Sequence, residues 1–194
     1  MDLQAVKTFF KIRNPQLTDK DFGLLFSKVS IYKKIKRFEF LVEKGEIDTN
    51  MYFILKGAFR SYIVQNGQEY CDVLRCTNDL YCNYISFINQ TPSRYYLQAL
   101  SNAEILGITR ADYYQLVEDN WKIERMWRKE TEQLFIYRIA RDHVLRLKAK
   151  DRIKHFLQVK PALFKEIPNK YLASYLRMSP ETFSREFRLL KEEK

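Results

Sequence analysis

The first 110 residues contain short runs rich in β-branched and aromatic residues, each bounded by turn-forming residues. Such runs predict β-strands, which we place at residues 38–43, 51–55, 59–64, 69–74, 95–100 and 103–108. Asn66-Gly67 stands between two of them and predicts a type I′ hairpin, because both central residues of that turn need positive φ. Apolar residues at helical spacing between Phe9 and Phe26 predict short helices before the strands. The pattern indicates an antiparallel sandwich or barrel with helices packed against it.

The pattern becomes helical after residue 110. All five glycines precede that point, so the rest of the chain is free to be almost wholly helical. A segment without Gly or Pro runs from about residue 112 to 147 and is longer than a typical globular helix. Apolar residues in it recur near a 3.5-residue period and predict a dimer seam formed by Ile123, Trp127, Leu134, Tyr137 and Val144. The alternative is a helix buried against its own domain.

Two short helices joined by a tight turn are predicted at residues 167–190. The first has an apolar face made of Tyr171, Leu172, Tyr175 and Leu176. Ser179 is a favourable N-cap for the second, and Pro180 occupies its first helical position. The second helix buries Phe183, Phe187 and Leu190, which leaves its outward face to Glu181, Thr182, Ser184, Arg185 and Arg188. Such a face is typical of a helix-turn-helix that reads base edges in DNA, although an ordinary helical hairpin shares the pattern.

Basic side chains are concentrated in the same part of the chain. The whole chain has 34 Lys and Arg against 24 Asp and Glu, which gives a net charge of +10. Residues 1–119 carry a net charge of only +1, whereas residues 120–194 carry +9. A basic helical part suits a polyanionic partner or an acidic membrane surface.

Other classes of protein find little support in the sequence. No stretch approaches 18 consecutive apolar residues and none resembles a signal peptide, so we expect a cytoplasmic protein with no membrane partner. Cys71, Cys76 and Cys82 include no CxxC pair and have no His nearby, which predicts buried free thiols and no metal site. His143 and His155 lie in the basic part, and no nucleophile elbow, P-loop or HExxH motif is present, so we expect no enzyme.

Two motifs and their order resemble those of a known family. The segment YFILKG at residues 52–57, preceded by Lys44-Gly45-Glu46, and the segment SPETFSR at residues 179–185 are similar to segments of the Crp/Fnr family of bacterial transcription regulators. Each motif alone is common, but their order and spacing are not. The resemblance implies an α+β fold with an N-terminal antiparallel β-roll of the cyclic-nucleotide-binding type (1–118), a long dimerisation helix (119–147) and a C-terminal helix-turn-helix domain (148–194). It also implies a homodimer that binds double-stranded DNA and recruits or blocks RNA polymerase.

The resemblance also assigns roles to residues of the second C-terminal helix. By position, Glu181 and Arg185 match the family's base-contacting residues. Arg185 could donate two hydrogen bonds to guanine O6 and N7, while Glu181 accepts one from a cytosine amine. We expect contacts to the DNA backbone from Ser179, Thr182, Ser184, Arg188, Lys170 and Arg177. Pro180 stands where many family members have a base-reading Arg, so the recognised base sequence should differ. The approach at residues 166–168 leaves little room for a wing hairpin.

The sensor segment departs from the pattern of cyclic-nucleotide-binding members. Those members hold the ribose and cyclic phosphate with a short Gly-Glu segment and a later Arg, whereas Cys82 and Asn83 stand at the matching positions here. Losing the Gly prevents close backbone approach to a phosphate, and losing the carboxylate removes the ribose acceptor, so we expect no binding of cyclic AMP. The candidate pocket for another small-molecule effector comprises Tyr81, Cys82, Asn83, Tyr84, Arg94 and Tyr95.

Several alternatives stay open at this point. The aromatic residues near the sensor segment could be ordinary core, in which case no effector binds. No cofactor is required by the sequence, and the N-terminal cysteines of the family's oxygen-sensing branch are missing, since Cys71 is the first cysteine. The first functional interpretation is a DNA-binding regulator with an altered effector pocket. The alternative is an effector-sensing protein whose basic helices dock an acidic protein, and salt-dependent duplex binding would distinguish the two.

Overall fold

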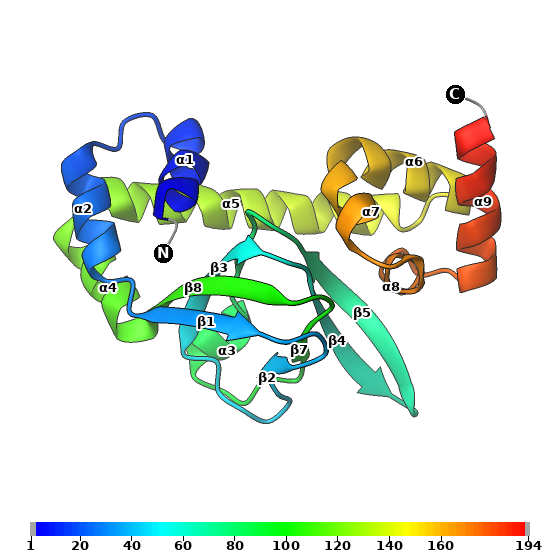
Figure 1. Cartoon of the computed structure of the whole chain (residues 1–194), viewed down its shortest axis with the longest axis horizontal. Coiled ribbons are helices and arrows are strands. Elements are labelled where there is room, and N and C mark those ends of the chain that lie inside the picture. Colours follow the sequence, from blue (N-terminus) through cyan, green and yellow to red (C-terminus); the bar gives the residue numbers. More distant parts are fainter. Residues whose placement is uncertain (1–2, 193–194) are drawn as a thin grey trace.

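Two antiparallel sheets form a β-roll in the computed structural model, which describes residues 3–192 (Figure 1). One sheet has the strand order β1 (Ile31–Ile35), β8 (Ala103–Thr109), β3 (Asn50–Lys56) and β6 (Leu80–Tyr81). The other has the order β2 (Phe40–Val42), β7 (Tyr96–Ala99), β4 (Phe59–Gln65) and β5 (Gln68–Arg75). Apolar side chains from both sheets, including Ile54, Phe59, Leu97 and Ile105, form the core of the roll. The predicted antiparallel β architecture is confirmed.

Turn geometry agrees with the glycine positions. Asn66 and Gly67 both have positive φ, 51° and 75°, and Gln65 pairs with Gln68 across the two-residue turn between β4 and β5. This is the predicted type I′ geometry. Gly57 joins β3 to β4 with a φ of 99°, and a Cβ atom there would lie 2.7 Å from the Cβ of Ala103. A side chain at position 57 would therefore force the roll apart.

Helices cover one side of the roll. They are α1 (Leu3–Arg13), α2 (Asp19–Ser27), α3 (Tyr84–Asn89) and α4 (Arg110–Asp119). Thr18 and Asp21 form a capping box at the start of α2, which satisfies two backbone N–H groups that the helix leaves unpaired. Apolar residues of α1, α2 and α4 form one core with β3, β8 and the first turns of the next helix.

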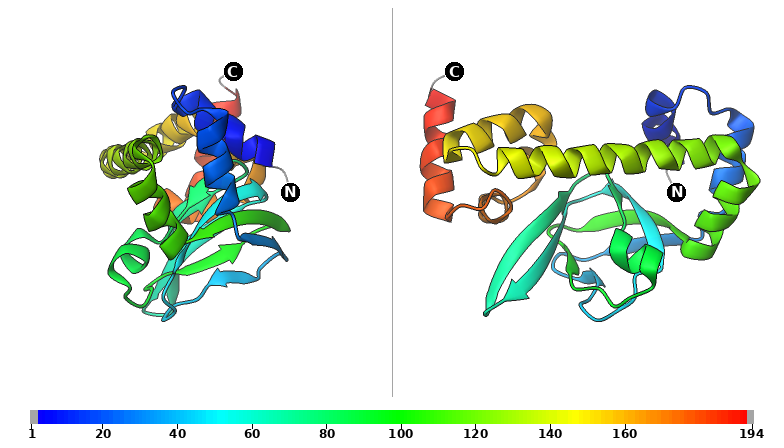
Figure 2. Two further views of the ribbon diagram at one scale, coloured as in Figure 1. Left: turned by 90° about the vertical axis from the view of Figure 1, so that its left-hand side faces the viewer. Right: turned by 180° about the vertical axis from the view of Figure 1, so that it is seen from behind.

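The long helix α5 (Trp121–Val144) runs the length of the molecule, from α1 and α2 at one end to the C-terminal helices at the other (Figure 2). The Gly- and Pro-free segment from about residue 112 to 147 is not one continuous helix, because α4 ends at Asp119 and α5 begins at Trp121. Asn120 leaves the helical region with φ −143°, and its side chain accepts hydrogen bonds from the N–H groups of Lys122 and Ile123. Asn120 therefore ends α4 and caps α5, a role for which Asn is well suited.

The C-terminal part is a small helical domain. It contains α6 (Ala149–Val159), α7 (Pro161–Glu166), α8 (Asn169–Tyr175) and α9 (Pro180–Glu192), with no strand within residues 145–192. Its core includes Ile153, Phe156, Leu172 and Phe183, and this core continues into the roll through Leu74, Cys76 and Leu100. None of the helices in the described part of the chain is long and apolar enough to cross a membrane.

Candidate nucleic-acid interface and ligand site

The predicted helix-turn-helix is present as α8 and α9. The turn between them has Arg177 in the left-handed region at φ 53°, and the N–H of Met178 donates to the carbonyl of Ala173 at 3.0 Å. Arg152 of α6 donates to the carbonyls of Leu176 and Arg177 at 2.6 and 3.0 Å, which satisfies acceptors that the end of α8 leaves open. The angle between the two helices is thus held from a third helix, a role of Arg152 that the sequence did not indicate.

The start of α9 follows the predicted signals. The hydroxyl of Ser179 accepts a hydrogen bond from the N–H of Thr182 at 3.2 Å, and Pro180 occupies the first helical position. On the inner face, Phe183 is fully buried and contacts the rings of Phe164 and Phe187 with centroids 6.4 and 5.4 Å apart. The inner face fixes which side chains of α9 are turned outward.

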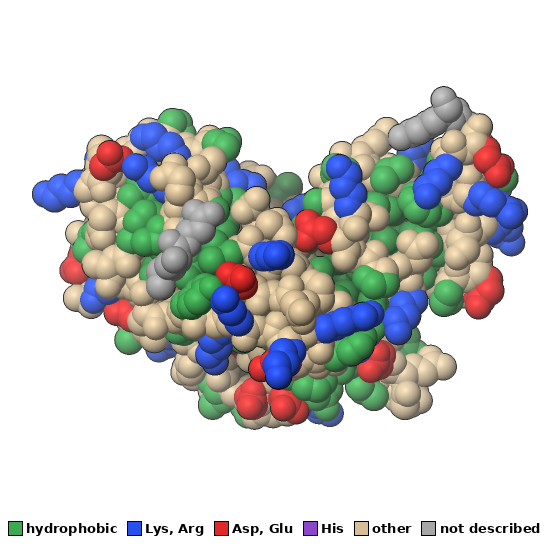
Figure 3. All heavy atoms as spheres, in the orientation of Figure 1, with side chains coloured by type: hydrophobic (Ala, Val, Ile, Leu, Met, Phe, Trp, Pro, Cys, Tyr) green, Lys and Arg blue, Asp and Glu red, His purple; other side chains and the backbone are tan. Residues whose placement is uncertain are grey.

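The outward face of α9 is polar and accessible. Glu181, Ser184, Arg185 and Arg188 are exposed, and Thr182 is half-buried. Lysine and arginine side chains are visible over this end of the molecule in Figure 3. The guanidinium of Arg185 contacts the carboxylate of Glu186 at 2.9 Å, so this pair must open or rearrange if Arg185 binds a base. The helix's own backbone N–H and Ser179 lower the pKa of Glu181, which keeps this side chain an acceptor at neutral pH.

The other predicted backbone-contacting residues lie on the same end. Lys170 and Arg177 are exposed, and together with Ser179 they line a cleft of about 1070 Å³ between the C-terminal domain and the β4–β5 hairpin. The Lys170 ammonium lies 4.7 Å from the ring centroid of Tyr171. The structure therefore brings all eight predicted DNA-contacting residues onto α8, α9 and the turn between them.

The sensor segment holds a closed polar network where a nucleotide phosphate would bind in related proteins. The side-chain amide of Asn83 donates to the hydroxyl of Ser93 at 2.6 Å, and its backbone N–H donates to Asp48 at 3.2 Å. The backbone N–H of Asp48 donates to the hydroxyl of Ser86 at 2.9 Å. Burial raises the pKa of Asp48 from 3.8 to about 6. A buried acid without a cation beside it repels an anionic ligand.

The six residues predicted to line one effector pocket do not come together. Tyr81, Cys82 and Tyr84 line a cavity between the roll and α5. Asn83 belongs to the polar network, Arg94 is exposed, and Tyr95 lines the cleft beside α8. Only Tyr84 of the six belongs to the short helix α3. Tyr81 lies in β6, and Arg94 and Tyr95 follow α3, so the chain carries these residues to different surfaces. The prediction of a single pocket was wrong in this respect.

The five residues predicted to form a dimer seam lie on the side of α5 that faces the rest of its own chain. Ile123 and Trp127 are only 1% and 6% exposed because they pack against the core of α1, α4 and β3. Val144 is buried in the core of the C-terminal domain, Leu134 lines the cavity, and the hydroxyl of Tyr137 is hydrogen-bonded to that of Tyr175. These five residues satisfy the alternative stated from the sequence, a helix buried against its own domain.

A second apolar face of α5 is exposed. Phe135, Ile136 and Ile139 are 67%, 56% and 47% exposed, and Arg128 and Glu132 precede them on the helix with their charges paired at 2.6 Å. A helix with apolar residues on two sides shows no single period, which explains why spacing alone selected the inward side. Exposed apolar residues grouped in this way mark an interaction surface.

The hairpin β4–β5 is joined to the C-terminal domain by charged groups. Asp72 of β5 accepts hydrogen bonds from Arg138 at 2.9 Å and from Arg141 at 3.1 Å. Arg141 is buried and also donates to the carbonyl of Tyr175. Burial alone would raise the pKa of Asp72, but the two arginines outweigh it and hold that pKa below its ordinary value. Arg141 interrupts the apolar pattern of its helix, and this is the signal by which the contact could have been found.

A stacked arginine forms the second junction. Arg60 of β4 is buried between the rings of Tyr62 and Tyr171, with its guanidinium carbon 4.0 and 4.6 Å from the two centroids. Its nitrogens donate to the side-chain carbonyl of Gln98 at 2.8 and 3.0 Å and pair with Glu69. Cation–π contacts of this kind are strongest when water is excluded. The sensor roll and the helix-turn-helix are therefore held in one arrangement.

Comparisons with known proteins agree with this architecture. Residues 32–120 match the family model described as the cyclic nucleotide-binding domain. FixK2 from Bradyrhizobium japonicum is 19% identical with a TM-score of 0.68, covering 84% of this chain and 85% of that one. CLP, described as a c-di-GMP-responsive global regulator in Xanthomonas campestris, is 14% identical with a TM-score of 0.67, covering 91% and 93%. A CooA mutant from Carboxydothermus hydrogenoformans is 15% identical with a TM-score of 0.66, covering 87% and 79%. A search of curated proteins found no match.

Proposed function

We propose that the chain is a homodimeric, DNA-binding transcription regulator that does not respond to cyclic AMP. Residues 32–120 match the family model described as the cyclic nucleotide-binding domain, and the fold is similar to those of FixK2 and CLP, which supports this proposal. In this proposal α9 lies in the major groove, with Arg185 and Glu181 toward base edges. The end of the molecule formed by α8 and α9 meets the DNA backbone through Lys170 and Arg177. RNA polymerase is the expected further partner.

One observation carries the proposal. Eight polar or charged side chains suited to DNA are accessible at one end of the molecule, on a helix pair whose inner face is locked by Phe183 and by the Arg152 contacts to the turn. Recognition of base edges needs side chains in a fixed geometry, because each bidentate contact depends on its angle to the base. Residues 120–194, which include α5 and the C-terminal domain, carry +9 of the chain's net charge of +10. A solvated helical hairpin requires neither feature.

Dimerisation is supported by the outer face of α5. Phe135, Ile136 and Ile139 form an apolar stripe along the long helix, and two copies of such a stripe can pack against each other about a two-fold axis. Helix-turn-helix dimers bind half-sites about one helical turn apart, so a two-fold arrangement would place two copies of α9 in successive major grooves. The seam in this proposal replaces the inward residues that the sequence indicated.

The absence of a response to cyclic AMP is supported by the network around Asp48. An incoming cyclic phosphate would have to displace the contacts among Asn83, Ser86 and Ser93 and would meet a carboxylate instead of an arginine. Arg94, which lies near the family's phosphate-pairing position in the sequence, is exposed. In this proposal the chain has the fold of the sensor domain but does not bind cyclic AMP.

The salt dependence of duplex binding tests the proposal against docking to an acidic protein. The double variant Lys170→Ala/Arg177→Ala removes two predicted phosphate contacts, and Lys33→Ala/Lys34→Ala, on the exposed side of β1, removes the same charge elsewhere. We expect the slope of log K against log salt to fall in magnitude by about 1.8 for the first variant and to change little for the second. Equal slopes for both variants, or stronger binding to polyglutamate than to a duplex, would favour protein docking.

A further inference from the structure

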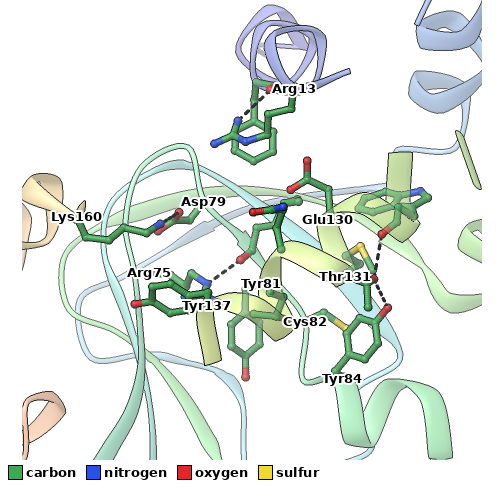
Figure 4. A pocket seen from close by; sticks show the side chains of 16 residues that line it. Arg13, Arg75, Asp79, Tyr81, Cys82, Tyr84, Glu130, Thr131, Tyr137 and Lys160 are labelled. Atoms are coloured by element: carbon green, nitrogen blue, oxygen red, sulfur yellow. Dashed lines mark hydrogen bonds and ion pairs between the residues drawn. The ribbon is translucent and has the colours of Figure 1, made fainter. Parts of the chain in front are cut away.

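A cavity of about 300 Å³ lies between α1, the end of the roll near β6 and the middle of α5. Figure 4 shows its labelled side chains, which converge from these elements and from the C-terminal domain through Lys160. The surface of the molecule is hollowed between the lobe of α1 and α2 and the lobe of α6 to α9 (Figure 3). Protein interiors are normally packed without spaces of this size, so the cavity is a candidate binding site.

The body of the cavity is apolar and aromatic. Phe9 of α1, Leu80 of β6, and Trp127, Leu134 and Tyr137 of α5 line it. Trp127 is 6% exposed, and its indole N–H has no hydrogen-bond partner among the described residues. That nitrogen is enclosed by protein atoms and is not accessible from the cavity, so Trp127 contributes apolar ring surface to the wall. An aromatic molecule would match this flat apolar surface.

The charged side chains around the cavity differ in whether they have a partner of opposite charge. Lys160 is paired with Asp79 at 3.3 Å, and Arg13 is the nearest cation to Glu130, whose burial raises its pKa. Arg75 differs from these, because its guanidinium donates only to the carbonyls of Leu80 at 2.9 Å and Leu74 at 3.1 Å. No carboxylate pairs with Arg75 within residues 3–192. A half-buried arginine without an anion is suited to receive one from a ligand.

We propose that this cavity binds a small aromatic molecule carrying a single anionic group, with its rings against Trp127 and Leu134 and its anion on Arg75. The site shares Cys82 with the sensor segment but does not include the polar network around Asp48, because Asn83, Ser86 and Ser93 do not line it. The cavity also extends to the C-terminal domain. Its wall includes Lys160, at the junction of α6 and α7, and Tyr137, whose hydroxyl is hydrogen-bonded to Tyr175 of α8. A bound molecule would therefore touch residues that position the helix-turn-helix. The effect on DNA rests on the proposed function, whereas binding itself does not.

The two tryptophans of the chain make a direct test possible. Trp121 is 65% exposed at the start of α5, so Trp121→Phe leaves Trp127, in the cavity wall, as the single emitter. The probe is 1-anilinonaphthalene-8-sulfonate, and N-phenyl-1-naphthylamine, which lacks the sulfonate, is the neutral comparison. We expect one saturable site per chain for each, with energy transfer from Trp127.

Three variants in the Trp121→Phe background locate the site. Arg75→Gln should weaken binding of the sulfonate by about 10-fold and leave the neutral probe within about 2-fold. Arg94→Gln removes an exposed arginine that does not line the cavity and should change neither. Leu134→Trp should fill the cavity and abolish binding of both probes, which is read from the probes' own fluorescence because this variant adds a tryptophan. Unchanged melting of Arg75→Gln with retained neutral-probe binding shows that its fold is intact.

Loss of sulfonate binding in Arg94→Gln, or equal weakening of both probes in Arg75→Gln, would overturn the proposal, as would binding that survives Leu134→Trp. Duplex binding, measured on the same proteins, separates this proposal from the preceding one. Saturable probe binding by a protein that binds no duplex supports the cavity and contradicts the DNA-binding function. Duplex binding by a protein that shows no saturable probe site leads to the opposite conclusion.

Discussion

Asp48 is buried at 3% exposure, and no lysine or arginine among residues 3–192 is paired with its carboxylate. The like charge of Glu46 adds to the effect of burial. Its oxygens accept only from the backbone N–H groups of Asn50 and Asn83, at 3.3 and 3.2 Å. Burial disfavours the charged form more than these two bonds favour it, which is why its pKa rises from 3.8 to about 6. Ionisation of Asp48 therefore lowers the free energy of unfolding, and the protonated form avoids this loss.

The pH dependence of stability tests this environment. The folded pKa of Asp48, about 6, lies above the ordinary value of 3.8, so its contribution is fully present below about pH 4 and is lost as pH rises through 6. In Asp48→Asn the free energy of unfolding should therefore gain about 1–3 kcal/mol relative to the wild type between pH 4 and pH 7. Urea unfolding at one-unit intervals measures this difference, with the exposed Asp119→Asn as the control. A difference that stays constant with pH would contradict the assignment.

Arg185 carries the prediction for base recognition. Truncating a bidentate guanine contact costs about 1–3 kcal/mol and relaxes one position of the site, so Arg185→Ala should do so at the cognate duplex. Lys170→Ala, which removes a phosphate contact, should weaken binding to all duplexes about equally. Fluorescence anisotropy with the cognate duplex and single-base variants distinguishes these two patterns. Unchanged specificity in Arg185→Ala would remove Arg185 from the recognition surface.

At the scale of elements, the sequence predicted the strands, turns and helix caps that depend on residues close together in the chain. The six expected strands, the Asn66-Gly67 turn and the cap at Ser179 are all present, because each depends on residues a few positions apart. The strands β1 and β6 were missed. β1 has three successive exposed residues, Tyr32, Lys33 and Lys34, at the edge of its sheet, and β6 is only two residues long, so both are defined by their neighbours in space.

The long helix shows the limit of periodicity. Its spacing identified an apolar face at Ile123 and Trp127, but only packing reveals that this face meets its own chain. The seam, the ligand-lining residues and the contacts of Asp72 all depend on which elements the fold brings together. Arg141 interrupts the apolar pattern and so marks a polar contact, but local spacing cannot identify its partner Asp72, which lies 69 positions away.

A charge on the outer face of α5 tests the corrected seam. Ile136 lies in the middle of the exposed stripe, and Ile136→Glu would place an unpaired carboxylate in a two-helix interface. We expect the variant to be monomeric at concentrations at which the wild type is dimeric, with its helical content unchanged. Ile12→Glu, at a residue 75% exposed on α1, is the matched control. Sedimentation equilibrium gives the mass, and a dimeric Ile136→Glu would exclude this seam.

At the scale of the whole molecule, the roll holds the helix-turn-helix through two polar junctions. Asp72 joins β5 to α5 beside α8, and Arg60 is stacked against Tyr171 of α8. The backbone N–H of Cys71 donates to the hydroxyl of Ser174 at 3.1 Å, next to the Asp72 contacts. The orientation of α9 relative to the roll therefore depends on these few groups.

Removing the Asp72 charge should loosen the junction. Breaking a half-buried ion pair leaves Arg141 buried without its anion, so Asp72→Asn should cost about 1–3 kcal/mol and speed exchange of the α8 amides about 10-fold or more. In the wild type the pKa of Asp72 is lower in the folded protein than in the unfolded chain. The stability that its ion pairs contribute is therefore present above the pKa of the unfolded chain and is lost as pH falls through the pKa of the folded protein. Hydrogen exchange by mass spectrometry measures the effect, with the exposed Asp142→Asn of α5 as the control. If the α8 amides exchange as slowly in Asp72→Asn as in the control, the Asp72 contacts do not hold α8 in place.

The most direct test of the central claim is selection and sequencing of random duplexes bound by the purified protein without added ligand, at two salt concentrations. A dimeric regulator with α9 in the major groove predicts an enriched two-fold symmetric motif with half-sites about one helical turn apart, retained at the higher salt. Weak binding without any enriched sequence, lost at the higher salt, would contradict sequence-specific DNA recognition by this helix pair.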